Sequence, residues 1–181
     1  MTSAKHTIVA LVEDKPGVLN RVASLFRRRG FNIESIAVGH SEIPHLSRMT
    51  IIVDGTTTSV EQVRKQLDKV IDVVRVSDIT EDNIVARELA LIKVKATSST
   101  RSEIMQIVDI FRANIVDVGF DSVTVEVTGD EEKINSLYSL LGGFGIKELA
   151  RTGLIAMPRG TTSPPRVGKE SPGTRARKQK A

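Results

Sequence analysis

The fold is decided by residues 13–33, which begin with Glu13-Asp14-Lys15-Pro16-Gly17-Val18-Leu19 and end with Gly30-Phe31-Asn32-Ile33. Between these ends, apolar residues recur at intervals of three and four, the period of a helix with one buried face. Proline fixes φ near the value of a first helical turn, and glycine commonly ends a helix. The stretch therefore predicts a strand at 8–12, a helix that starts at Pro16 or Gly17, and a second strand at 33–38.

Both ends of this helix carry groups that suit a small ligand. The first turn of a helix offers unpaired backbone N–H groups and the positive end of the helix dipole, so a carboxylate binds well there. Gly17 lacks a Cβ, which lets a ligand approach the backbone closely. The carboxylate of Asp14 can accept hydrogen bonds from an ammonium group, and the Asn32 amide can both donate and accept. Together these groups complement the two charged ends of a free amino acid.

The separation of the two helix ends limits how they can be used. About a dozen helical residues separate Gly17 from Gly30, and at roughly 1.5 Å per residue they hold the ends about 18 Å apart. One amino acid cannot span that distance, so a shared ligand requires two chains with antiparallel helices, as an isologous dimer provides. The alternative is purely structural: Asp14 caps the helix, the two glycines mark its ends, and Asn32 lies in a turn. Local chemistry alone leaves both interpretations open.

Several segments resemble known families. Asp14-Lys15-Pro16-Gly17-Val18-Leu19 resembles the signature of the ACT domain, a regulatory module that binds amino acids. Two longer segments closely resemble the small regulatory subunit of acetolactate synthase, also called acetohydroxyacid synthase: Phe26-Arg27-Arg28-Arg29-Gly30-Phe31-Asn32-Ile33-Glu34-Ser35 and Leu46-Ser47-Arg48-Met49-Thr50-Ile51. The likeness covers residues 5–160 and continues through Phe111-Arg112-Ala113 and Phe144-Gly145-Ile146.

The resemblance implies a function in the biosynthesis of valine, isoleucine and leucine. A small subunit of this kind has no catalytic site of its own; it activates a catalytic subunit and confers feedback inhibition by valine. That partner condenses two pyruvates, or pyruvate with 2-oxobutanoate, and holds thiamine diphosphate, Mg2+ and FAD, whereas no cofactor is expected in this chain. The expected partners are therefore the catalytic large subunit and a second copy of this chain, in a cytoplasmic homodimer formed through the ACT domain.

The effector site expected in that dimer combines both helix ends. The valine carboxylate meets backbone N–H groups at the helix start, its ammonium is received by Asp14 and by Asn32 of the second chain, and a leucine or isoleucine lines the apolar pocket. The expected effector residues are Asp14, Gly17, Val18, Leu19, Asn32 and Ile33. Many members of the family carry asparagine where this chain has Asp14, so the choice among branched-chain amino acids stays open.

Composition excludes several classes of protein. The chain has 181 residues, of which 40% are hydrophobic and 27% charged, enough to bury one larger core or two small ones. It has no cysteine, which excludes a disulfide framework, a thiolate metal site and a cysteine nucleophile. It has no run of about 18 apolar residues and no signal-peptide pattern, so we expect a soluble protein.

The formal net charge of +4 is unevenly distributed. Residues 161–181 hold six basic residues and one acidic residue, so this segment carries +5 and residues 1–160 carry −1. Proline, glycine, serine and threonine dominate the segment, which predicts a disordered basic tail. Such a tail can bind nucleic acid by charge alone. The nearly neutral remainder, without a DNA-reading helix, disfavours a nucleic-acid binder.

Hydrophobic periodicity predicts the same β-α-β-β-α-β order twice. The strands expected in the first half are 8–12, 33–38, 49–53 and 73–79, and those in the second half are 89–96, 115–118, 122–127 and 146–151. The second helix would start with Ser59 and Gln62 as a capping box, and later helices begin at Thr100 and Asp130. The first helix should bury Val18, Leu19, Val22, Leu25 and Phe26, and the last should bury Ile134, Leu137, Tyr138 and Leu141.

This order predicts an α+β protein with two tandem ferredoxin-like domains, each an antiparallel sheet with two helices on one face. The predicted divisions are an ACT domain at 5–80, a linker at 81–87 that contains the polar Glu81-Asp82-Asn83, a second ferredoxin-like domain at 88–160 and the tail at 161–181. Thr97-Ser98-Ser99-Thr100 stands in the second half where the first has its glycine-containing loop. Ligand binding is therefore assigned to the first half only.

Catalytic patterns are sparse. His6, His40 and His45 are scattered, and no acidic residue is spaced with them as a metal-ligand set or a triad, so neither a catalytic nor a metal site is expected. Arg48 is expected at the start of a strand, available for an interface. The alternative function is a free-standing ACT-type amino-acid sensor or transcription regulator, which would bind its ligand without affecting acetolactate formation.

Overall fold

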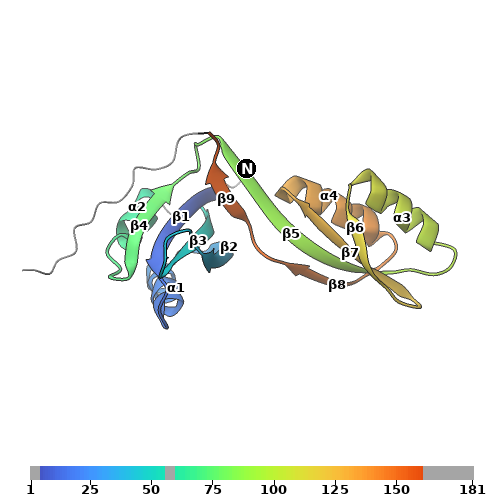
Figure 1. The fold of residues 1–181 in the computed structure, drawn as a ribbon, viewed down its shortest axis with the longest axis horizontal. Coiled ribbons are helices and arrows are strands. Elements are labelled where there is room, and N and C mark those ends of the chain that lie inside the picture. Colours follow the sequence, from blue (N-terminus) through green and yellow to red (C-terminus); the bar gives the residue numbers. More distant parts are fainter. Residues whose placement is uncertain (1–4, 56–59, 161–181) are drawn as a thin grey trace, which may run out of the picture.

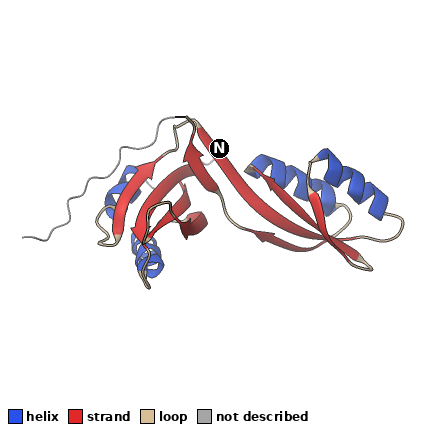
Figure 2. Ribbon diagram, in the orientation of Figure 1, coloured by secondary structure: helices blue, strands red, loops and turns tan. Residues whose placement is uncertain are grey.

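The computed structural model describes residues 5–55 and 60–160, which form two antiparallel sheets and four helices (Figure 1, Figure 2). The elements of the first half are β1 (Lys5–Glu13), α1 (Val18–Arg29), β2 (Ile33–His40), β3 (Leu46–Asp54), α2 (Val60–Leu67) and β4 (Val73–Asp78). The elements of the second half are β5 (Ile84–Lys95), α3 (Arg101–Ile110), β6 (Asn114–Val118), β7 (Ser122–Gly129), α4 (Glu131–Gly142), β8 (Ile146–Arg151) and β9 (Ile155–Pro158). The α+β class and the twice-repeated order predicted from the sequence are confirmed.

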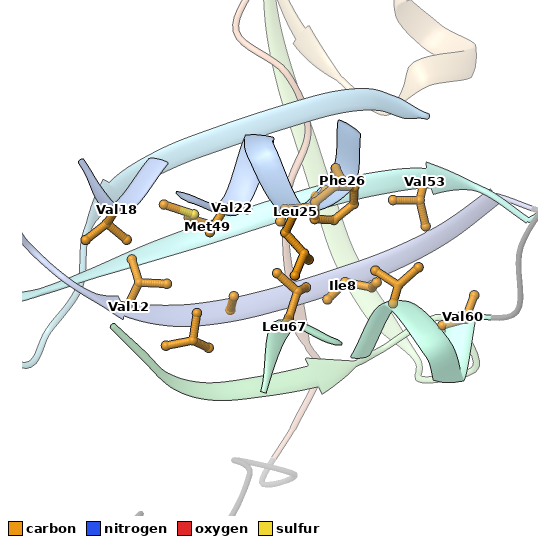
Figure 3. Close-up of a cluster of buried hydrophobic side chains, with 14 residues drawn as sticks. Ile8, Val12, Val18, Val22, Leu25, Phe26, Met49, Val53, Val60 and Leu67 are labelled. Carbon is orange, nitrogen blue, oxygen red and sulfur yellow. The ribbon is translucent and has the colours of Figure 1, made fainter. Parts of the chain in front are cut away.

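The first sheet has the strand order β2-β3-β1-β4, and all of its pairs are antiparallel. Alternate residues of β1 and β3 point to one face, because side chains alternate along a strand. On that face they meet the apolar stripes of α1 and α2, so both helices cover the same side (Figure 3). The fully buried residues of this core include Ile8, Val22, Phe26, Met49, Ile51 and Leu67.

The second sheet repeats this arrangement with the order β6-β7-β5-β8. Its core is a separate cluster, in which α3 and α4 pack on alternate residues of β5 and β7. The members with no exposed surface are Ala90, Ile92, Val94, Ala96, Ile104, Val125, Leu137 and Leu141. As predicted, Asp130 caps α4: its Oδ1 accepts a hydrogen bond of 2.9 Å from the backbone N–H of Lys133.

The last described strand, β9, was not predicted from the sequence. A further strand, β9, pairs with residues 84–87, so part of the segment that the sequence assigns to a linker is the first third of β5. Figure 1 shows β5 running as one strand from the first sheet to the second, with β9 beside its near end. Ala156 and Ala86 there pack on Val9 and Ile79 of the first half. Burial against a distant strand, and not local periodicity, stabilises this pairing.

Two helix residues expected in the cores are exposed. Leu19 of α1 is 49% exposed and Tyr138 of α4 is 39% exposed. Leu19 follows the buried Val18, and Tyr138 follows the buried Leu137. Successive residues of a helix are rotated by about 100° around its axis, so each of these two residues lies at the margin of the buried stripe. Ser59 of the expected capping box and the tail 161–181 lie outside the described residues.

Candidate functional site

The loop between β1 and α1 leaves the start of α1 open. Gly17 is the N-cap residue, with φ of 88°, and a Cβ added to it would meet no atom within 4 Å. A positive φ of this kind favours glycine, and a glycine cap has no side chain to bind the N–H groups of the first turn. Val18, at the first helical position, is buried, so it can offer a ligand its backbone but not its side chain. The exposed Leu19 side chain stands one residue further on.

Asp14 is anchored by its backbone, and its carboxylate is half-exposed. The Asp14 N–H donates a 2.8 Å hydrogen bond to the carbonyl of His45, in the turn between β2 and β3. One carboxylate oxygen lies 3.4 Å from Nδ1 of His40. Because Gly17 is the N-cap and α1 has no side-chain cap bond at this end, the interpretation of Asp14 as a helix cap is not supported. The carboxylate is placed where a cationic group could reach it from solvent.

The other expected site residues lie at the far end of α1. Gly30 ends the helix with φ of 70°, and its N–H donates to the carbonyls of Arg27 and Phe26. Asn32 follows as an exposed residue, and Ile33 begins β2 half-buried against the core. Since α1 has 12 residues, about 18 Å separate the two ends of the helix.

The structure therefore brings the six expected residues together in two groups and not in one. Asp14, Gly17, Val18 and Leu19 share the start of α1, and Asn32 and Ile33 share its end. Within one chain no single amino acid contacts both groups. Gly17 and Gly30 mark the two ends of α1, as the purely structural interpretation predicts. The open first turn of α1 is also compatible with the interpretation as a ligand site.

The corresponding loop of the second half is closed by its own side chains. The N–H of Thr97 donates to Oγ1 of Thr100 at 3.0 Å, and the Thr97 hydroxyl lies 2.9 Å from that of Ser99. The N–H of Arg101, the first residue of α3, donates to the Thr97 carbonyl. These groups satisfy one another, so this loop has little to offer a carboxylate.

Between the two halves, the structure assembles polar residues that sequence reasoning missed. A cleft of about 540 Å³ is lined by Lys5, Thr7, Glu34, Ser35, Ile36, Ile52, Glu88, Glu131, Arg151, Thr152, Gly153 and Leu154. Arg151 forms an ion pair with the buried Glu88, whose carboxylate raises the pKa of that guanidinium. These residues come from β1, β2, β3, β5, α4, β8 and the segment between β8 and β9, and no local pattern connects them. One sequence feature could have indicated part of this site. A lone glycine between two predicted strands, here Gly153, is typical of an unusual backbone angle, and its φ is positive in the structure.

Arg48, expected to be available for an interface, is used within the chain. Its Nη2 donates a 2.8 Å hydrogen bond to the Ala156 carbonyl of β9, and burial lowers its pKa. It also lines an apolar groove of about 310 Å³ together with Val38 and Met157.

Within residues 5–55 and 60–160, no three histidine or acidic side chains come together as a possible metal site. No helix in those ranges is long and apolar enough to cross a membrane.

Two family models together match most of the chain. Residues 87–160 match the family described as "Small subunit of acetolactate synthase", and residues 8–75 match the "AHAS small subunit-like ACT domain". Both matches lie on the halves that the fold separates.

Similar proteins carry the same description. A probable acetolactate synthase small subunit of Archaeoglobus fulgidus is 60% identical over 86% of this chain and 98% of its own length. The acetolactate synthase small subunit of Bacillus subtilis is 53% identical, over 87% of this chain and 92% of its own length. Among solved structures, the acetolactate synthase small subunit of Thermotoga maritima has a TM-score of 0.79 and 45% identity, and the match covers 86% of this chain and 98% of that one.

Proposed function

The chain belongs to the family of acetolactate synthase small subunits, and from this membership we propose that it is the regulatory subunit of a cytoplasmic acetolactate synthase. It binds the catalytic subunit, raises its activity and makes it sensitive to valine. The observation that carries the proposal is the identity of 60% over nearly the full length of a named small subunit. The chain itself contributes no catalytic group, and thiamine diphosphate, Mg2+ and FAD belong to the catalytic partner.

The effector binds at the start of α1. The carboxylate of valine accepts hydrogen bonds from backbone N–H groups of the first turn, at the positive end of the helix dipole. The open space above Gly17 admits it without a clash. The ammonium group is received by the half-exposed carboxylate of Asp14, and the side chain of Leu19 provides apolar contact.

A second copy of the chain completes this site. β2 is an edge strand of the first sheet, so its outer backbone groups can pair with another strand. If two copies pair through β2 with their α1 helices antiparallel, the end of α1 in one copy lies beside the start of α1 in the other. Asn32 and Ile33 of the second chain then complete the site, which resolves the separation of about 18 Å.

Inhibition follows if the catalytic subunit distinguishes two arrangements of this dimer. Valine contacts both chains, so it stabilises the arrangement in which both groups of residues reach it. A catalytic subunit that is activated only by the other arrangement loses activity when valine binds. A coupling of about 1 to 3 kcal/mol is enough for regulation of ordinary strength.

Acetolactate formation by the catalytic subunit of the same organism tests the proposal. The rate is measured with the catalytic subunit alone, with this chain added, and with this chain plus valine. We expect activation by the chain and reversal of that activation by valine. Activation by the chain without inhibition by valine would support the catalytic subunit as its partner and would contradict valine as its effector. No effect on the rate, together with amino-acid binding by the isolated chain, would instead identify a free-standing sensor.

A further inference from the structure

The strand that begins with Ile33, one of the proposed effector residues, also contacts the second domain. Ile33, Glu34 and Ser35 are consecutive at the start of β2. Ile33 pairs with Val53 and Ser35 with Ile52, so Glu34 is an extra residue without a partner in β3. This is a β-bulge, which locally bends a strand and redirects its side chains.

The residue after the bulge is bonded to the segment that joins β8 to β9. Oγ of Ser35 accepts a hydrogen bond of 3.1 Å from the backbone N–H of Leu154. The neighbouring Gly153 approaches so closely that an added Cβ would lie 2.9 Å from Ser35 Oγ and 3.0 Å from the carbonyl oxygen of Ile36. Here the backbone of the second domain packs directly on the backbone of β2.

The bulged residue itself reaches the second domain through a lysine. Nζ of Lys5 lies 3.2 Å from Oε2 of Glu34 and donates at 2.9 Å to Oε1 of Glu131, the first residue of α4. All three side chains are partly exposed, and exposed ion pairs contribute little on their own. The bond between Ser35 and Leu154 is therefore the stronger of the two connections.

We propose that residues 153–154 position the effector-binding end of β2, and that the second domain thereby sets the affinity for the effector without contacting it. The inference rests on the proposed function for the identity of the effector. Ser35 lies two residues from Ile33, across the bulge at Glu34, so at most about 6.6 Å of strand separates them. A strand already fixed at that distance loses less conformational freedom when a ligand binds to it, so binding is tighter.

The variant Ser35→Ala removes the acceptor and retains the volume of the side chain within one atom. Hydrogen exchange of residues 33–36 is measured in the full-length chain without effector, and valine binding is measured by calorimetry. We expect faster exchange at 33–36 and valine binding weaker by about threefold to tenfold, as for the loss of one hydrogen bond. Ser139→Ala, at an exposed position of α4, is the matched control and should change neither quantity.

A second variant, Lys5→Met, removes the bridge to Glu131 and keeps the length of the side chain. Its expected effect on valine binding is in the same direction and below about threefold. Lys65→Met is its control, because Lys65 forms an exposed ion pair of 2.7 Å with Glu61 within α2. In Ser35→Ala and in Lys5→Met, activation of the catalytic subunit in the absence of valine should equal that of the wild type.

Failure of this inference can be separated from failure of the proposed function. Exchange of residues 33–36 needs neither valine nor a catalytic subunit. If Ser35→Ala leaves that exchange at the wild-type rate, residues 153–154 do not hold β2 and the inference is overturned. It is also overturned if exchange becomes faster while valine affinity stays unchanged. If the wild type instead fails to regulate acetolactate formation, the proposed function is lost while the exchange experiment still decides the positioning role.

Discussion

Under the proposed function, Gly17 is the residue on which effector binding is expected to depend most directly. The variant Gly17→Asp places a carboxylate at the start of α1, where it repels the carboxylate of the effector and occupies the same N–H groups. We expect the valine concentration for half-inhibition to rise at least about tenfold, since one lost charge-assisted contact is worth roughly 1.5 to 3 kcal/mol. Activation without valine should be retained. Both quantities come from acetolactate assays with the catalytic subunit.

Two further variants separate charge from backbone strain in that experiment. Gly17→Ala adds a Cβ at φ of 88° without a charge, so it should weaken the response less than aspartate does. Gly160→Asp adds the same side chain at φ of 72°, also with no atom within 4 Å, but far along the chain from α1. It should leave the valine response unchanged. If Gly17→Asp stayed fully sensitive to valine, the effector would not bind at the start of α1.

Gly153 is constrained by close packing as well as by its backbone angle. With φ of 85° and the Ile36 carbonyl oxygen 3.0 Å from an added Cβ, Gly153→Ala combines strain with a backbone clash. We expect a loss of about 2 to 4 kcal/mol in the free energy of unfolding, or separation of the segment from β2. Urea denaturation measures the first and hydrogen exchange of residues 33–36 the second.

Gly142→Ala provides the opposite expectation for the same change. Gly142 is the last residue of α4, and an added Cβ meets no atom within 4 Å. Alanine should be neutral or stabilising there by up to about 1 kcal/mol, because it is the better helix former. A neutral Gly153→Ala would mean that the backbone contact to β2 is loose.

At the scale of the elements, α4 offers a direct test of capping. Asp130→Ala removes the acceptor for the N–H of Lys133 and should cost about 1 kcal/mol. Hydrogen exchange in the first turn of α4 reports it, with faster exchange expected. Asp130→Asn keeps an acceptor oxygen and loses only the favourable charge at the helix start, so its effect should be smaller. Equal effects of alanine and asparagine would show that charge, and not the hydrogen bond, stabilises this end.

The elements that the sequence predicted are those with a strong local period. The strand of Met49, Ile51 and Val53 alternates into the core, and α4 begins at its cap and ends at its glycines as expected. Such elements follow from the residues of one short segment. Leu19 and Tyr138 were misplaced because spacing gives the centre of a buried stripe more accurately than its margins.

The elements that the sequence missed depend on distant partners. β9 spans Ile155–Pro158 and is stabilised by pairing with residues 84–87 and by burial of Ala156 against Val9. The bulge at Glu34 likewise exists only in the register of β2 against β3. Neither β9 nor the bulge has a turn motif or a period of its own. Local patterns therefore predict no strand at β9 and assign residues 84–87, which pair with it, to a linker.

At the scale of the whole molecule, the sequence predicts both the residues of the candidate site and the dimer that would bring them together, and both stay predictions. Asp14 and Gly17 were chosen for their chemistry, and the structure places them together at an open helix start. The separation from Asn32 could also be predicted, because the length of a helix is a local property. The contribution of Ser35 and Gly153 required the second domain to be placed against the first.

The bridge between the domains at Lys5 gives a prediction about pH. The hydrogen bond to Glu131 raises the pKa of Lys5, and Glu34 acts in the same direction. A lysine whose pKa is higher in the folded state stabilises fully below the unfolded value of about 10.4, and this stability is lost as the pH rises through the folded value. The difference in free energy of unfolding between the wild type and Lys5→Met should therefore be constant from about pH 6 to 9 and decrease above about pH 10.

Urea denaturation of both proteins across this range tests that expectation, and a high-salt series should reduce the difference because the ion pair is partly exposed. A difference that persisted unchanged above about pH 11 would mean that the lysine stem stabilises by packing and not by charge. Because the pKa of Lys5 is raised above its ordinary value, the lysine stays charged at neutral pH, and its bridge to Glu131 is not expected to respond to changes of pH there.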